Sequence, residues 1–153
     1  MTIRYFWEDF PPGWRYESGS RTLTAADIKT FARSYDPQAY HTDEAAARDT
    51  PFGGLIASGW QTCAVAMRLM CDGYLLESAC LGSPGLDELR WLAPVRPGDA
   101  LRLRATVLEQ TPSATRPERG TVTFRWEVVN QDDVVACRMI GRQHYRRRTP
   151  ATA

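Results

Sequence analysis

The sequence predicts an α+β protein in which an antiparallel sheet of five strands wraps around one long central helix. Two patterns support this prediction. Residues 58–76 carry apolar side chains almost all round a helical projection, which is typical of a helix buried on most sides. From residue 86 onward, apolar residues recur at every second position, the period of a strand with one buried and one solvated face.

A strand and two short helices are expected before the long helix. They lie at residues 14–23, about 25–35 and about 42–47. Thr24 and Asp27 have the spacing of a capping box, which pairs free amides at the start of a helix. Pro37 disfavours the helical conformation at Asp36, so the first helix should end there. Pro51-Phe-Gly-Gly54 then forces a loop.

Four further strands are expected after the long helix, at residues 86–95, 101–107, 121–128 and 134–146. In the second of these, Leu101 and Leu103 alternate with Arg102 and Arg104, which indicates one buried face. An open sheet of five strands leaves its edges uncovered. We therefore expect edge pairing between copies of the chain, giving a homodimer or a higher homo-oligomer.

Residues 1–153 are expected to form a single domain, with residues from about 147 onward as a loose tail. Hydrophobic residues make up 43% of the chain and charged residues 24%, as in ordinary globular proteins. The 19 Lys and Arg nearly balance the 18 Asp and Glu, so the net charge of +1 gives no general attraction for nucleic acid. Arg142 and residues 146–148 are expected to be solvated, with contact to a phosphorylated ligand or a neighbouring subunit as the alternative.

The four cysteines, at positions 63, 71, 80 and 137, include no C-x-x-C pair and no histidine at ligand spacing. They therefore indicate neither a zinc site nor a disulfide framework, and are expected to be small buried side chains in a reducing compartment. Acidic residues interrupt the N-terminal segment, and no apolar run approaches the length of a membrane span. These features predict a cytoplasmic protein without membrane contact.

Asp36-Pro-Gln-Ala-Tyr-His41 places a carboxylate and an imidazole five residues apart, in a segment that cannot be one continuous helix. Asp36 follows the C-terminus of a helix, where the helix dipole disfavours negative charge. A carboxylate with a raised pKa beside a histidine is suited to general acid–base catalysis. The alternative is a helix-stopping turn followed by an ordinary polar histidine. His144 is expected on a solvated strand face with Arg138 and Arg142, and is not a candidate.

The segment from Phe52 to Trp60 carries glycines and leads into the long helix. Gly54 and Gly59 have the spacing of a phosphate loop, but Trp60 stands where the lysine should be, so nucleotide binding is not supported. Free amides at a helix start can nevertheless hold a carbonyl oxygen that gains negative charge. Ser58 is expected to cap the helix, with a catalytic hydroxyl as the alternative.

Together and in this order, Asp36-Pro-Gln-Ala-Tyr-His41 and Gly54-Leu-Ile-Ala-Ser-Gly59 resemble the signature of the MaoC-like (R)-specific enoyl-CoA hydratase family. That signature is D-x-N-P-[LIV]-H followed by a G-x-I-A-H-G-like segment. Phe6-Trp-Glu-Asp-Phe-Pro-Pro-Gly13 and the run from Arg90 to Asp99 also look like the family, so the resemblance covers nearly the whole chain. It implies the hot-dog fold, in which a sheet wraps around a long helix. The chain departs from the signature at three positions, Gln38, Ala39 and Ser58.

The resemblance implies reversible addition of water to a trans-2-enoyl-CoA, giving a (3R)-3-hydroxyacyl-CoA. Asp36 and His41 would hold the water between them, and which of the two is the base stays open because the two groups titrate together. Coenzyme A enters as part of the substrate, and neither a metal nor another cofactor is expected. A hot-dog acyl-CoA thioesterase and a non-catalytic acyl-CoA binding module are the alternatives.

The resemblance also implies which residues surround the substrate. Those expected to hold the thioester oxygen and the substrate backbone are Gly53, Gly54, Ser58 and Gly59. Those that could line an acyl pocket are Tyr40, Trp60 and Met67. The length and branching of the acyl chain do not follow from the sequence.

Overall fold

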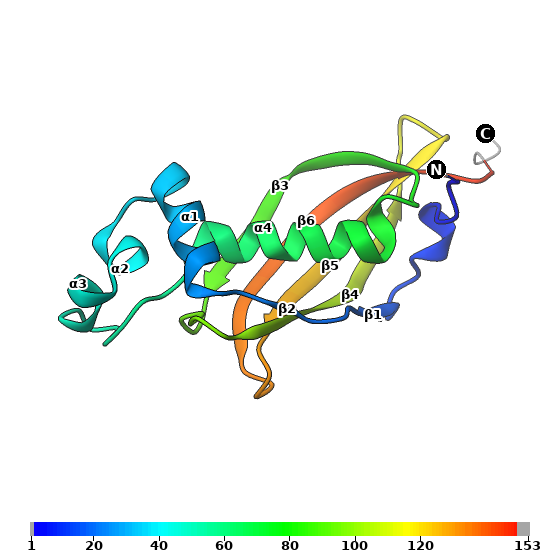
Figure 1. Cartoon of the computed structure of the whole chain (residues 1–153). Helices are drawn as coiled ribbons and strands as arrows, with labels where there is room; N and C mark the ends of the chain where they lie inside the picture. The colour runs from blue at the N-terminus through cyan, green and yellow to red at the C-terminus, as the bar shows by residue number, and fades with distance from the viewer. Residues whose placement is uncertain (1, 150–153) are drawn as a thin grey trace.

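The computed structural model describes residues 2–149 and confirms the predicted α+β architecture. An antiparallel sheet curves around α4 (Gly59–Met70), which lies along the sheet (Figure 1). Within the described residues the sheet has six strands in place of the expected five, in the order β1-β4-β5-β6-β3 with β2 paired to β4. The strands are β1 (Arg15–Glu17), β2 (Arg21–Thr22), β3 (Cys80–Trp91), β4 (Ala100–Pro112), β5 (Arg119–Val129) and β6 (Val135–Arg146).

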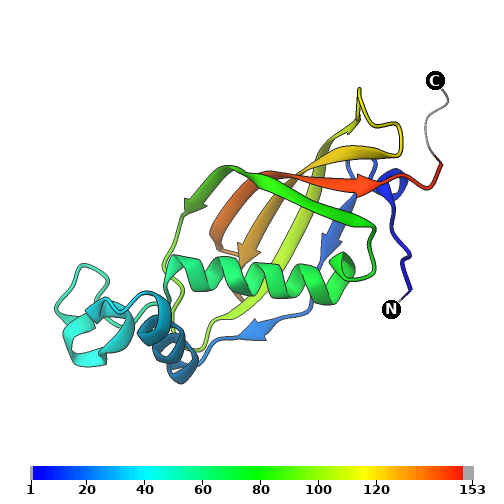
Figure 2. The ribbon, with the colours of Figure 1, turned by 90° about the horizontal axis from the view of Figure 1, so that it is seen from above.

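Three short helices stand apart from the sheet. They are α1 (Ala25–Tyr35), α2 (Ala39–Thr42) and α3 (Glu44–Arg48). Both views place them beyond the N-terminal end of α4, at the opposite end of the molecule from the short helix η1 (Trp7–Asp9) (Figures 1 and 2). This arrangement brings the end of α1 to the start of α4. No helix among residues 2–149 is long and apolar enough to cross a membrane.

The expected strand at 14–23 is interrupted, which explains the additional strand. Arg15 to Glu17 pair with Thr106 to Arg104, but Arg21 and Thr22 pair in a register shifted by one residue. At the interruption the hydroxyl of Ser18 accepts the amide hydrogen of Leu103 at 2.8 Å, where a backbone carbonyl would normally accept. One extra residue on one strand of an antiparallel pair is a β-bulge.

Strand β3 begins at Cys80, six residues earlier than expected. Gly82-Ser-Pro-Gly85, which precedes the expected start at residue 86, belongs to the strand and pairs with β6 with register shifts. Proline and glycine are tolerated there because β3 is an edge strand, where one side of the backbone has no partner strand to pair with.

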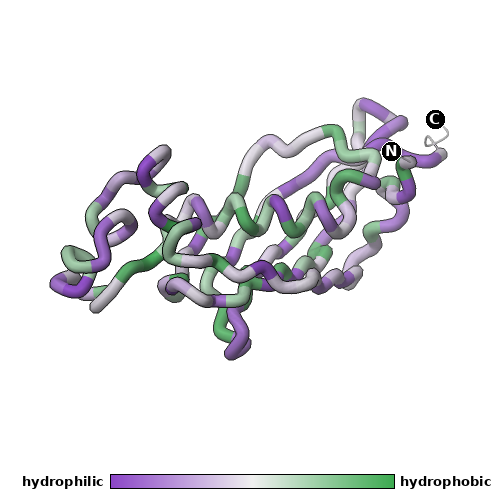
Figure 3. The backbone as a smooth tube through the Cα atoms, viewed as in Figure 1, coloured by the Kyte–Doolittle hydropathy of each residue, from purple (hydrophilic) through white to green (hydrophobic). Residues whose placement is uncertain are grey.

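Helix α4 is only partly buried, which corrects the expectation that it is buried on most sides. Val65, Ala66 and Leu69 face the core, whereas Trp60 exposes 59% and Met67 47% of their surfaces. Hydropathy colouring shows hydrophobic and hydrophilic residues interleaved along the helix (Figure 3). The helical pattern predicted as far as residue 76 is also divided, because a π-helical turn, Cys71–Leu75, follows Met70.

The short helices begin and end largely where their capping residues predict. The Thr24–Asp27 capping box opens α1, and Asp36 ends it. The helix expected at about 42–47 begins after Asp43, whose carboxylate accepts the amides of Ala45 and Ala46. The turn α2 was not predicted, because four residues are too few for a helical pattern to be recognised.

The first two residues of the expected tail, Arg147 and Arg148, contact the N-terminal segment. The guanidinium of Arg147 lies over the ring of Trp7, and that of Arg148 lies over Phe6 and pairs with Asp9 at 2.7 Å. The main-chain amide of Arg147 also donates to Glu118. Residues 150–153 of the predicted tail lie outside the described residues, and the boundary of the tail stays a prediction.

Candidate active site

Asp36 lies at the C-terminal cap of α1 and receives hydrogen bonds on both carboxylate oxygens. Ser58 Oγ donates to Oδ2 at 2.7 Å, and Gln38 Nε2 donates to Oδ1 at 2.7 Å. His41 Nε2 lies 3.3 Å from Oδ2. Only 17% of the side-chain surface is exposed, so these three neighbours replace most of the water that a surface carboxylate would have.

His41 lies on α2 and is buried, with its two ring nitrogens in different surroundings. Nδ1 lies 2.7 Å from the carbonyl oxygen of Ile56. A carbonyl oxygen can only accept, so Nδ1 carries the hydrogen. In the neutral imidazole, Nε2 therefore holds the lone pair and faces Asp36. The sequence-predicted pair does converge, with the carboxylate and Nε2 directed at the same space.

Ser58 connects Asp36 to the start of α4. It is the N-cap residue of that helix and is fully buried, and its Oγ accepts the amide hydrogen of Trp60 at 3.3 Å while donating to Asp36. The expected capping role of Ser58 is therefore present. The helix start carries partial positive charge, so α4 favours the anion that the C-terminus of α1 disfavours.

The pKa of Asp36 shifts in the opposite direction from the one the sequence suggested. Burial by itself would raise this pKa, but the hydrogen bonds from Ser58 and Gln38 and the nearby His41 together hold it below its usual value. The sequence suggested a raised pKa because the helix dipole disfavours negative charge at the C-terminus of α1. This expectation was wrong because the hydrogen bond from Ser58, which comes from a distant segment, cannot be read from local sequence. The ionised carboxylate is thus the form that the site favours.

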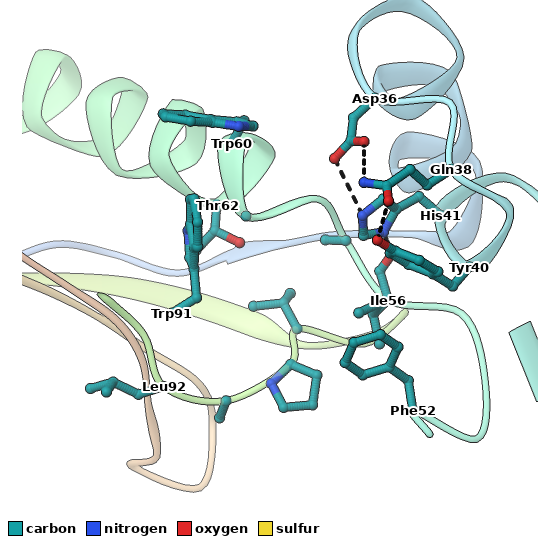
Figure 4. Close-up of a pocket in the computed structure, with 15 residues that line it drawn as sticks. Asp36, Gln38, Tyr40, His41, Phe52, Ile56, Trp60, Thr62, Trp91 and Leu92 are labelled. Atoms are coloured by element: carbon teal, nitrogen blue, oxygen red, sulfur yellow. Dashed lines mark hydrogen bonds and ion pairs between the residues drawn. The ribbon is translucent and has the colours of Figure 1, made fainter. Parts of the chain in front are cut away.

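A cavity of about 400 Å³ opens beside this pair, within the range of small-molecule sites. One end is polar and contains Asp36 and His41, and the other is apolar (Figure 4). The lining residues are Asp36, Gln38, Tyr40, His41, Phe52, Ile56, Ala57, Gly59, Trp60, Thr62, Trp91, Leu92, Ala93, Pro94 and Val95. This arrangement suits a ligand with a reactive polar end and an apolar chain.

The other residues named from the sequence are divided between this cavity and its surroundings. Tyr40, Trp60 and Gly59 line the cavity. Gly53 and Gly54 lie in the preceding loop, both with positive φ, and neither lines it. Met67 lies further along the exposed face of α4 and does not line it either.

Trp91 is a cavity residue that the sequence did not single out. Its ring lies so close to Gly59 that a Cβ atom on Gly59 would come within 2.3 Å of it. The ring of Trp60 meets that of Trp91 edge-on at 5.4 Å. Gly59 is therefore required at the helix start by the close approach of Trp91, and only the fold brings the two together.

Among the described residues, no three or more His, Cys, Asp and Glu side chains gather closely enough to hold a metal ion. His144 lies on β6, where Nδ1 is 3.0 Å from the hydroxyl of Thr121, and it does not line the cavity.

Comparison with known proteins agrees with the fold. The chain matches the family model of the MaoC like domain over residues 10–130. A MaoC-like dehydratase structure from Rhodospirillum rubrum is 43% identical, with a TM-score of 0.89 over 95% of this chain and 99% of that one. The uncharacterized protein YdeM of Bacillus subtilis is 31% identical over 83% of this chain and 89% of its own length. The 3-hydroxyacyl-thioester dehydratase Z of Mycobacterium tuberculosis is 30% identical over 70% of this chain and 72% of its own.

Proposed function

The chain belongs to the MaoC-like dehydratase family and has its hot-dog fold, and from this premise we propose that it reversibly hydrates a trans-2-enoyl-CoA to a (3R)-3-hydroxyacyl-CoA. The observation that carries the proposal is the convergence of Asp36 Oδ2 and His41 Nε2, 3.3 Å apart, at the polar end of the cavity. A relative named as a 3-hydroxyacyl-thioester dehydratase supports the reaction class. The cytoplasmic location expected from the sequence stays a prediction.

Asp36 and His41 offer two hydrogen-bond acceptors to one water molecule. The carboxylate is ionised and Nε2 carries a lone pair, so the water can donate one hydrogen to each and keep its own lone pair for C3 of the enoyl group. As the C–O bond forms, the water proton passes to Nε2. The imidazolium then gives a proton to C2, so one water is added in total. Asp36 stays ionised and stabilises the imidazolium.

The start of α4 can stabilise the charge that develops on the thioester. When water adds to C3, negative charge moves onto the thioester oxygen. The first amides of a helix have no carbonyl partner within the helix, and Gly59, the first residue of α4, lines the cavity. We place the thioester oxygen at this amide, with the acyl chain toward Trp60 and Trp91. The proposed reaction requires no metal or further cofactor.

The proposal is tested with a panel of trans-2-enoyl-CoAs of different length and branching. Hydration removes the absorbance of the conjugated enoyl thioester and leaves the thioester bond intact. The expected result is loss of this absorbance without release of thiol, and a (3R) product in chiral analysis. Free CoA, detected with a thiol reagent, would instead identify a thioesterase. Binding measured by calorimetry without turnover of any substrate would identify a binding module.

Ser58→Ala is expected to weaken both the helix cap and the site. Loss of the N-cap should lower the free energy of unfolding by about 1 kcal/mol, and loss of the donor to Oδ2 should lower kcat about 10-fold. Urea unfolding and the hydration assay measure the two effects. Ser34→Ala, at an exposed position on α1, is the matched control. Unchanged kcat in Ser58→Ala would contradict this role.

We further propose that the functional unit is a homodimer formed through α4 and β3. Strand β3 is an edge of the sheet, so its outer backbone groups can pair with another strand. Trp60 and Met67 on α4 and Leu86 and Trp91 on β3 are exposed, and the contact between Trp60 and Trp91 joins the two elements. A second copy suits this surface because two identical edge strands can pair about a twofold axis.

The expected oligomer is a dimer in sedimentation velocity. Met67→Glu should shift the population toward monomer, since a charge at the centre of an apolar interface is costly to bury. Leu108→Glu changes a similarly exposed apolar residue on β4, away from this surface, and should leave the dimer intact. A wild-type monomer at assay concentrations, or equal effects of the two substitutions, would contradict the interface.

A further inference from the structure

Tyr40 and Gln38 form a hydrogen-bonded chain that ends on the carboxylate of Asp36. The Tyr40 hydroxyl donates to Gln38 Oε1, and Gln38 Nε2 donates to Asp36 Oδ1 at 2.7 Å. The three side chains follow one another along one wall of the cavity (Figure 4). We propose that Gln38 and Tyr40 are positioning residues that fix the orientation of the Asp36 carboxylate, an inference that rests on the proposed function.

Both members of this chain are held by their own surroundings. The main-chain amide of Gln38 donates to the carbonyl of Asp36 at 2.8 Å, which closes a tight turn. The ring of Tyr40 meets that of His41 edge-on at 4.4 Å and contacts the ring of Phe52 at 5.3 Å. Tyr40 therefore cannot swing away without losing two aromatic contacts, and it holds Gln38 in the orientation that presents an N–H to Asp36.

The hydrogen-bonded chain separates the roles of the two carboxylate oxygens. A carboxylate turns easily about its last side-chain bond, and the preference of that bond for particular angles is weak. Gln38 holds Oδ1 from one side and Ser58 holds Oδ2 from the other. The plane of the group is then fixed, with Oδ2 directed toward His41 Nε2. Without Gln38, the carboxylate could rotate and lose the geometry that holds the water.

The direction of the hydrogen bonds, from Tyr40 through Gln38 to Asp36, also affects the pKa of Asp36. Hydrogen bonds from Ser58 at the start of α4 and from Gln38 lower the pKa of Asp36, and a positive charge on the imidazole of His41 lowers it further. An amide that receives a hydrogen bond on its oxygen becomes a better donor through its nitrogen. Tyr40 therefore strengthens the donation from Gln38, although it does not touch Asp36.

Two substitutions test the hydrogen-bonded chain, one with a large expected effect and one with a smaller effect. Gln38→Glu keeps the shape of the side chain but replaces the donor with a second carboxylate, so the acid limb of the pH profile of kcat should move to higher pH by about one unit or more. Tyr40→Phe keeps the ring and removes only the hydroxyl, so kcat should fall about threefold to 10-fold with a smaller movement in the same direction. KM should change less than kcat in both variants, because orientation of the catalytic group is altered.

A second measurement does not depend on turnover. The titration of the Asp36 carboxyl carbon, followed by ¹³C NMR, should move to higher pH in both variants, whether or not an enoyl thioester is found to react. Tyr35→Phe, at an exposed tyrosine on α1, should leave the titration and the rate unchanged. If the Asp36 titration is the same in wild type, Gln38→Glu and Tyr40→Phe, the positioning role is wrong. A shifted titration with no hydration activity would overturn the proposed function alone.

Discussion

Replacing His41 with asparagine is expected to lower kcat for hydration on the order of 100-fold or more while the fold is retained. The amide of asparagine can still donate to the carbonyl of Ile56, which now accepts from Nδ1 at 2.7 Å. It offers no group at the position of Nε2, so no base receives the proton of the attacking water. The substitution thus separates the structural nitrogen of His41 from the proposed chemical one.

Steady-state kinetics with the best enoyl-CoA of the panel measure this effect, and circular dichroism with thermal unfolding checks the fold. His41→Ala should lose as much activity and should also lose stability, because the buried carbonyl of Ile56 would have no partner, at a cost of about 1–3 kcal/mol. His144→Asn changes the other histidine, which lies on β6 away from the cavity, and should keep full activity. Activity within a few-fold of wild type in His41→Asn would remove His41 from the reaction.

The sequence was sufficient to predict the fold class and the residues that converge. The alternation in β4 to β6 reflects a core that one face of each strand must enter, so it can be read without coordinates. The apolar pattern of α4 predicted the helix but overstated how much of it is buried. Asp36 and His41 could be named because they are close in sequence and separated by Pro37, which ends one helix. Ser58 could be named as a cap because capping depends on local spacing.

Features that depend on contacts between distant segments were not predicted. The direction of the pKa shift of Asp36 depends on Ser58, 22 residues away in the chain. Trp91 reaches Gly59 only after β3 has paired with β6, and no local pattern records that approach. The sequence identified Gln38 as a departure from the family signature and Tyr40 as a possible acyl-pocket residue, but it did not predict the hydrogen bond between them. Polar side chains at every second position, 36, 38 and 40, are the signal that could have suggested that these three side chains are hydrogen-bonded to one another.

Asp36→Asn is the second substitution expected to lower kcat on the order of 100-fold or more. The variant has nearly the same shape but carries an NH₂ group in place of one carboxylate oxygen. The lone pair of His41 Nε2, which lies 3.3 Å from Oδ2 in the wild type, can accept a hydrogen bond from this group. An asparagine hydrogen bond to Nε2 would occupy the atom that should receive the water proton, so the loss has two causes, a missing charge and a blocked base.

The stability of this variant should differ from wild type in a way that depends on pH. The pKa of Asp36 is lower in the folded protein than in the unfolded chain, where it is near 3.8. The ionised carboxylate therefore stabilises the fold fully at pH values above the unfolded pKa. This contribution is lost as the pH falls through the folded pKa. The difference in unfolding free energy between wild type and Asp36→Asn should therefore favour wild type most at neutral pH and shrink in acid. Urea unfolding at neutral and acid pH measures it, with Asp72→Asn, at an exposed ion pair with Arg68, as the control. A difference that grows toward acid pH would contradict the lowered pKa, and with it the ionised carboxylate on which the proposed handling of the water depends.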